Sequence, residues 1–236
     1  MNKINIVYFV WGHTDSIAIY QGSLLRQSIL SVKKHIENAK IFVYLGDRAR
    51  FHAQEKFWEK HQVSILPQTR KRLGYFNKLD FFSVAIEDLD HFIFLDTDTL
   101  VKRYPHKLLD IKSPLLFAIP YTSKRRELRK TWKSQVKFLS KFGVKKPFLY
   151  PNTSVIKVDQ SDSVFWEKYK KSLNTIIQEF LKKVDKRKYT NHLNKGRYND
   201  ELYFALALNR CNLKILNHVV PIKVSRSWLK HGCKLI

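Results

Sequence analysis

The sequence of 236 residues is long enough to bury a core, because 44% of its residues are hydrophobic and 14% are aromatic. Seven Gly, seven Pro and the lack of a fixed-period repeat exclude collagen-like, low-complexity and solenoid proteins. A formal net charge of +24 indicates anionic partners, such as nucleic acid, an acidic glycan or anionic lipid headgroups.

The first half of the chain alternates apolar runs with segments of helical spacing. Strands are predicted at residues 1–11, 41–45, 63–66, 92–95 and 115–119, and helices at residues 23–37, 52–61 and 75–86. Ser23 is the expected cap of the first helix, which follows a loop from Val10 to Asp15. Strands that alternate with helices predict an α/β fold with a parallel, doubly wound sheet.

The second half of the chain continues this alternation and carries most of the positive charge. Strands are predicted at residues 150–158 and 213–216, and helices at residues 162–182 and 199–208, capped by Asp162 and Asn199. Residues 123–146 are expected to form a basic amphipathic helix or an ordered loop, the alternative being a solvated helix face with an ordinary apolar stripe. Ten basic residues and one acid lie between Lys124 and Lys146, and no acid follows Glu201.

The compartment is predicted from the two cysteines and the N-terminus. Cys211 and Cys233 are too few for a disulfide framework and lack metal-site spacing, so we expect ordinary thiols in the cytoplasm. The apolar residues 1–11 are too short for a membrane span and lack a small-residue cleavage site. Any membrane contact is therefore expected to be peripheral.

Two carboxylates, Asp96 and Asp98, directly follow the apolar run Phe92–Leu95. The carboxyl ends of parallel strands carry the chemistry of such sheets, and residues i and i+2 of extended chain point the same way. Two acids with one spacer, Thr97, can therefore address one hard cation, Mn²⁺ or Mg²⁺, together with substrate phosphates. The alternative for this pair is a turn and a helix cap, and the second such pair, Asp88 and Asp90, is expected only to solvate a helix-to-strand turn.

Five segments together resemble the nucleotide-sugar glycosyltransferases of the GT-A fold, nearest to glycosyltransferase family 8. The segments are Phe92–Val101 with its D-x-D motif, the basic-Leu pair Lys78–Leu79, Pro151–Val158, Asn199–Leu202 and Lys230–Lys234. Ser154 stands where that family usually has Gly, and Glu201 replaces a commoner Gln. Lys230–Lys234 is a compressed form of the family's C-terminal His-x-x-Gly-x-x-Lys signature.

The resemblance implies a single GT-A-like domain over residues 1–236. Residues 1–101 would bind the nucleotide sugar, residues 102–218 would face the acceptor, and residues 219–236 would form a C-terminal lid or tail. The implied reaction moves a sugar from a nucleoside-diphosphate donor, most simply a UDP-sugar, to a glycan or glycolipid acceptor, phosphorylated or not. The setting would be surface polysaccharide or lipopolysaccharide-type biosynthesis.

Each predicted site residue has a role and an ordinary structural alternative. Asp96 and Asp98 would bind the metal, with His231 either a third ligand or part of a plain basic tail. The remaining candidates fall into three groups. The cations that would contact the diphosphate, or else remain solvated, are Lys78, Arg72 and Lys234. The residues that would contact the nucleotide are Val10, Trp11, Asp15 and Thr97, unless Trp11 belongs to the core. The residues that would face the acceptor or the sugar are Asn152, Thr153, Asp200 and Glu201, of which Asp200 and Glu201 could instead cap a helix.

Two rival functions stay open. A nucleic-acid-binding module would explain the charge and the aromatic residues among the lysines, but not the carboxylates. A metal-dependent nuclease or nucleotidyltransferase would explain both, with Asp200 and Glu201 as further carboxylates. An anionic membrane surface is the other expected partner of the basic half.

Overall fold

A seven-stranded sheet forms the centre of the protein, in a computed structural model that describes residues 3–10, 15–45, 55–67, 77–120, 140, 143–144, 153–183, 200–210, 219–224 and 229–230. The strand order is β3-β2-β1-β4-β7-β6-β8. The strands are β1 (Ile4–Val10), β2 (Ala39–Leu45), β3 (Val63–Pro67), β4 (His91–Leu95), β6 (Leu115–Pro120), β7 (Val155–Asp159) and β8 (Val219–Val224). Strand β7 is antiparallel to both neighbours, and the other pairs are parallel.

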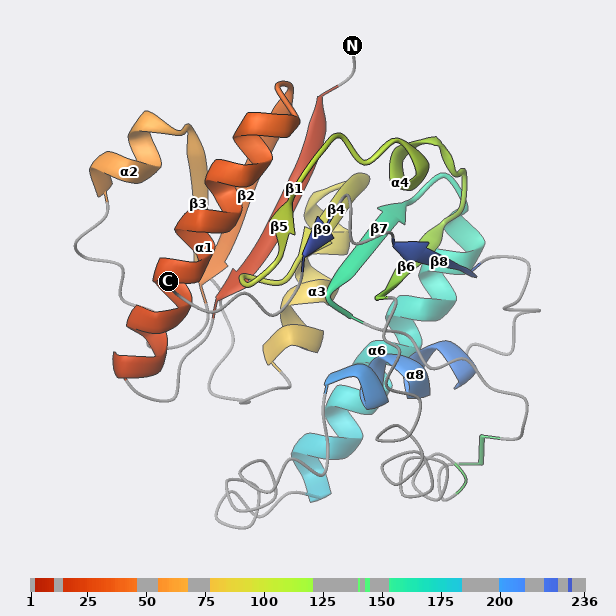
Figure 1. The fold of residues 1–236 in the computed structure, drawn as a ribbon. Helices are drawn as coiled ribbons and strands as arrows, with labels where there is room; N and C mark the ends of the chain where they lie inside the picture. Colours follow the sequence, from red (N-terminus) through yellow and green to blue (C-terminus); the bar gives the residue numbers. More distant parts are fainter. Residues whose placement is uncertain are drawn as a thin grey trace, which may run out of the picture.

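Helices cover both faces of this sheet (Figure 1). One face carries α1 (Asp15–His35), α2 (Glu55–Lys60) and α4 (His106–Asp110), and the other carries α3 (Asn77–Asp88), α6 (Ser163–Lys183) and α8 (Asp200–Arg210). Successive side chains of β4 point to opposite faces of the sheet and enter two separate hydrophobic cores. Phe92 and Phe94 pack toward α3, whereas Ile93 and Leu95 pack toward α1. The predicted fold class, a mostly parallel α/β sheet flanked by helices, is confirmed.

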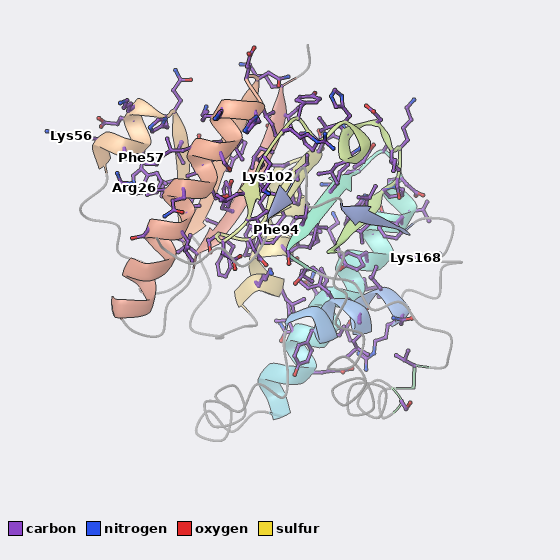
Figure 2. The ribbon with its side chains drawn as sticks, in the orientation of Figure 1. Arg26, Lys56, Phe57, Phe94, Lys102 and Lys168 are labelled. Carbon is purple, nitrogen blue, oxygen red and sulfur yellow. The ribbon has the colours of Figure 1, made fainter. Side chains whose placement is uncertain are left out.

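The two cores differ in their side chains. The face of α3, α6 and α8 is rich in aromatic residues, with Phe82 in edge contact with Phe92, Tyr169 and Phe204. The face of α1 is mainly aliphatic, and a guanidinium above a ring links α1 to α2, since Arg26 lies 4.8 Å from the centroid of Phe57 (Figure 2). Each fully buried large apolar side chain contributes about 1.5–3 kcal/mol, so both cores hold the sheet in place.

Most predicted elements of the first half are confirmed, and one helix boundary is wrong. Helix α1 begins at Asp15, so Ser23 lies inside the helix and does not cap it. The Gly22-Ser23 pair resembles a helix start, yet Gly inside a helix costs only about 1 kcal/mol, and the helix continues through it. Asp15, expected in a loop, is therefore the first residue of α1.

The second half holds a further difference, in the segment predicted as a tail. Residues 219–224 form β8, which pairs in parallel with β6 at the edge of the sheet. Pro221 interrupts the strand pattern in the sequence, but an edge strand tolerates Pro because one side of its backbone needs no partner. The strand predicted at residues 213–216 lies outside the described residues, as does nearly all of 123–146.

A separate two-stranded sheet joins β5 (Leu100–Val101) to β9 (Leu229–Lys230), antiparallel, with Leu100 opposite Lys230. Helix α6 begins as predicted, because the Phe165 N–H donates to Asp162 Oδ1 at 2.9 Å and satisfies one free donor of the first turn. Among the helices of the described ranges, none is both long enough and apolar enough to cross a membrane.

Candidate functional site

The turn that follows β4 carries the two predicted metal ligands. The Asp96 N–H donates to the carbonyl of Ser154 at 2.9 Å, and the Asp96 carbonyl accepts from the Thr99 N–H at 3.0 Å. The first bond fixes the end of β4 to the start of β7, and the second closes the turn around Asp98. Asp96, Thr97 and Asp98 are all partly exposed, so the turn meets solvent at the carboxyl end of β4.

Lys78 near the start of α3 pairs with the first of these carboxylates. Its Nζ lies 2.7 Å from Asp96 Oδ1, and the side chains are 10% and 26% exposed. The same Nζ donates to the carbonyl and to Oγ1 of Thr153, both at 3.2 Å, and lies 4.9 Å from the ring centroid of Phe94. Figure 2 shows Phe94 at the centre of the molecule. A solvated surface position is therefore excluded for Lys78.

This arrangement follows from the strand's alternation. Asp96 continues the series of Phe92 and Phe94, so it lies on the face of the sheet that α3 covers. Lys78 precedes Leu79, which is fully buried, and its ammonium group lies above the Phe94 ring and reaches the carboxylate. The charge-assisted hydrogen bond at 2.7 Å is stronger than a neutral one, so it fixes Asp96 firmly.

A second set of polar groups holds the turn from the α1 face. Ser28 Oγ donates to the carbonyl of Thr99, and the Tyr8 hydroxyl lies 2.8 Å from Ser28 Oγ. All three residues are fully buried. Burial raises the pKa of Tyr8 above its usual value, with the Ser28 hydrogen bond a smaller, opposite influence, so the phenol is a neutral donor. The Val101 N–H donates to Ser31 Oγ at 3.0 Å.

Sequence reasoning missed Tyr8, Ser28 and Ser31 as contributors to this turn. Ser28 recurs at helical spacing with apolar residues such as Leu25 and Ile29, so it fits the buried stripe of α1. The available signal was a hydroxyl at a core position, because a buried polar group needs a partner.

The other predicted site residues have varied positions. Val10 ends β1 with a fully buried side chain, and Thr153 is 2% exposed. Asp15 begins α1, whereas Asp200 and Glu201 begin α8, but the side chains of these three acids are outside the description. Trp11, Arg72, Asn152, His231 and Lys234 lie outside the described residues altogether. The structure thus brings together Lys78, Asp96, Thr97, Asp98 and Thr153.

The donor set fits a hard divalent cation. Asp96 and Asp98 offer oxygen ligands at one turn, and Mg²⁺ or Mn²⁺ needs only one or two carboxylates when substrate phosphates complete the shell. In the part of the chain that the structure describes, three or more His, Cys, Asp or Glu side chains do not gather anywhere in a metal-binding group. Strand β9 ends one residue before His231 and pairs with β5, which begins two residues after Asp98.

The second Asp-x-Asp pair has the structural role expected of it. Asp88 ends α3, Asp90 precedes β4, and both side chains are exposed. Asp88 Oδ2 accepts a hydrogen bond from the Tyr44 hydroxyl at 2.8 Å. Burial raises the pKa of Tyr44, and the neighbouring Asp88 raises it further. This pair therefore solvates a helix-to-strand connection.

Comparison with known proteins decides the fold. No protein-family profile and no curated protein sequence matches the chain. The structure of the galactosyltransferase LgtC, solved with donor and acceptor sugar analogues, superposes with a TM-score of 0.60 at 13% identity, over 98% of this chain and 87% of LgtC. The chain has the GT-A fold. The bifunctional glycosyltransferase WbbM also matches, with a TM-score of 0.53 at 13% identity, over 93% of this chain and 38% of WbbM.

At this level of identity the likeness concerns the fold. Within a GT-A fold, the turn after β4 lies where parallel sheets of this kind bind their ligands, outside the carboxyl ends of the strands. The expectation of a GT-A-like fold drawn from short motifs is therefore confirmed, and the activity is argued separately from the site.

Proposed function

We propose that the protein is a divalent-metal-dependent glycosyltransferase that moves a sugar from a nucleoside-diphosphate donor, most simply a UDP-sugar, to a glycan or glycolipid acceptor. One observation carries this proposal. Asp96 and Asp98 lie in a partly exposed, hydrogen-bonded turn at the carboxyl end of a central strand in a GT-A fold, and Lys78 forms an ion pair with Asp96.

The chemistry of the site suits the loss of a nucleoside diphosphate. Asp96 and Asp98 would hold Mn²⁺ or Mg²⁺, which when bound neutralises charge on the departing diphosphate. Lys78 keeps Asp96 oriented through a 2.7 Å contact and adds a positive charge at the same place. Because Lys78, Thr153 and Asp96 come from three separate segments of the chain, the hydrogen bonds that Lys78 makes to the other two hold the Asp96 carboxylate in place without a ligand.

Further residues are assigned roles as part of the same proposal. Asp200 and Glu201, at the start of α8, would face the sugar or acceptor. His231 would complete the metal shell, and the pairing of β9 with β5 supports this because it brings the chain before His231 beside the chain after Asp98. Asn152 and Thr153 would contact the acceptor side. Val10, Trp11, Asp15, Thr97, Arg72 and Lys234 would contact the nucleotide or its diphosphate.

The charge distribution supports an anionic acceptor or surface. The described ranges hold nearly balanced numbers of acidic and basic residues, so most of the formal +24 lies in the segments between them. Several of these segments directly follow strands that end at the same edge as β4, among them residues 68–76 and 121–139. A phosphate-bearing glycan, or a glycolipid in an anionic membrane met from the cytoplasmic side, would complement this charge.

The experiment is calorimetry of UDP binding with Mn²⁺ or with EDTA, on the wild type and on the Asp96→Asn/Asp98→Asn double variant. The wild type should bind UDP only with Mn²⁺, and the double variant should lose that binding while it still unfolds cooperatively. Asp88→Asn/Asp90→Asn is the matched control, since it removes the exposed pair of the same spacing. Unchanged UDP binding in the first variant would refute the metal site.

A second measurement separates the proposed function from its rivals. Slow hydrolysis of a UDP-sugar in the presence of Mn²⁺, and none with EDTA, is expected of a transferase without its acceptor. Tight single-stranded nucleic acid binding that ignores EDTA, with no UDP binding, would favour a nucleic-acid-binding protein instead.

A further inference from the structure

We infer that Ser28 and Ser31 of α1 are positioning residues for the Asp96–Asp98 turn, and that they act together with Tyr8. The inference rests on the proposed function, because it concerns how that metal-binding turn is held. It adds residues from β1 and α1, and the two serines contact the backbone of Thr99 and Val101.

The direction of the hydrogen bonds follows from the chemistry of the groups, because a carbonyl oxygen can only accept and a serine hydroxyl has one proton. Ser28 Oγ donates its one proton to the Thr99 carbonyl, so the Tyr8 hydroxyl, 2.8 Å away, donates to Ser28 Oγ. Ser31 Oγ donates to the Ser28 carbonyl at 2.6 Å and accepts from the Val101 N–H at 3.0 Å. The two serines therefore contact the chain at the two residues that flank Leu100.

These contacts complete the support of the turn. Its upstream end is fixed by Lys78 and by the Ser154 carbonyl, both of which contact Asp96. Its downstream end is fixed at Thr99 by Ser28, so Asp98 lies between two anchored residues. Ser31 extends the same support to β5, which pairs with β9. Helix α1 therefore contacts both the Asp96–Asp98 turn and β5, the strand that pairs with β9.

A purely structural role would be the alternative, since buried hydroxyls also satisfy backbone groups wherever they occur. The chain contains a suitable comparison. Ser172 of α6 is 9% exposed, and its Oγ donates to the Ala207 carbonyl of α8 at 3.0 Å. It makes the same kind of buried bond on the other face of the sheet. Ser28 and Ser172 should therefore cost similar stability when changed to Ala but differ in their effect on metal binding.

The experiment measures the Mn²⁺ concentration that half-saturates binding in the presence of excess UDP, by calorimetry well below the unfolding temperature of each variant. Ser28→Ala should raise this concentration about tenfold, since changing a residue behind a metal ligand typically weakens metal binding about 10–100-fold. Ser172→Ala should lower the melting temperature and leave the concentration within about twofold of wild type. Tyr8→Phe should give a smaller rise than Ser28→Ala, because the bond from Ser28 to Thr99 remains.

Equal Mn²⁺ requirements for Ser28→Ala and Ser172→Ala would overturn the inference. If Ser28→Ala does not fold, Ser31→Ala is judged by the same comparison, since it removes the partner of the Val101 N–H. Failure of the proposed function itself is distinguishable, because the wild type would then show no Mn²⁺-dependent UDP binding.

Discussion

Lys78 and Asp96 should be energetically coupled, and the structure allows the size of the effect to be worked out. Lys78→Met keeps an unbranched apolar side chain but removes the ammonium group, whose Nζ lies 4.9 Å from the ring centroid of Phe94. The change leaves the Asp96 carboxylate without its 2.7 Å contact and deprives the Thr153 carbonyl and hydroxyl of a donor.

Removal of one partner from a buried ion pair costs about 3–5 kcal/mol in unfolding free energy. The Asp96 side chain is 26% exposed, so water replaces part of the lost contact, and we expect a cost of about 2–3 kcal/mol. For a chain of this size each 1 kcal/mol lowers the melting temperature by about 2–4 °C, which gives a fall of about 4–12 °C.

A double-mutant cycle with Asp96→Asn, followed by urea unfolding, should return a coupling energy of about 1–2 kcal/mol. Lys157→Met is the matched control, because Lys157 Nζ donates to the carbonyls of Leu109 and Ile111 at 2.9 and 2.7 Å, on the opposite face of the sheet. It should destabilise the protein but show no coupling to Asp96. A coupling below about 0.5 kcal/mol between Lys78 and Asp96 would refute the pairing.

Two further predictions concern the C-terminal residues and the basic segments. Truncation after Lys230 keeps β9 and removes His231 and Lys234, so it should weaken Mn²⁺-dependent UDP binding without a loss of stability. Truncation after Ser227 should also destabilise the protein, because β5 loses its partner strand. Wild-type UDP binding after truncation at Lys230 would exclude His231 as a metal ligand. In sedimentation with liposomes, the protein should bind anionic vesicles and release them as the salt concentration rises, because each Lys or Arg near the membrane surface contributes about 1 kcal/mol. Equal binding to neutral vesicles would contradict an electrostatic attachment.

The strands were predictable where burial on both faces produces a continuous apolar run. Residues 92–95 are such a run, and β4 spans them. Periodicity does not encode strand direction, so the antiparallel β7 could not be foreseen. The start of α1 was missed because a Gly-Ser pair inside a helix resembles a cap, and β8 was missed because an edge strand can contain Pro221.

The site was predictable only in its local part. The spacing of Asp96 and Asp98 follows from the strand's period and could be read directly. The contact between Lys78 and Thr153 joins residues 75 positions apart, and that between Ser28 and Thr99 joins residues 71 apart, so both depend on the completed sheet. The pairing of β5 with β9, which brings the C-terminal strand toward the turn, is equally non-local.

The two Asp-x-Asp pairs of this chain have the same residue types and spacing but opposite surroundings. The side chains of Asp88 and Asp90 are exposed, and Asp88 accepts a hydrogen bond from the Tyr44 hydroxyl. The turn from Asp96 to Thr99 instead contacts three buried polar residues, Ser28, Lys78 and Ser154, and Lys78 in turn donates to a fourth, Thr153. Buried polar groups are costly unless paired, and a turn that only reversed the chain would not need them on both faces of the sheet. The surroundings, rather than the motif, therefore distinguish the proposed metal-binding pair from the solvating one.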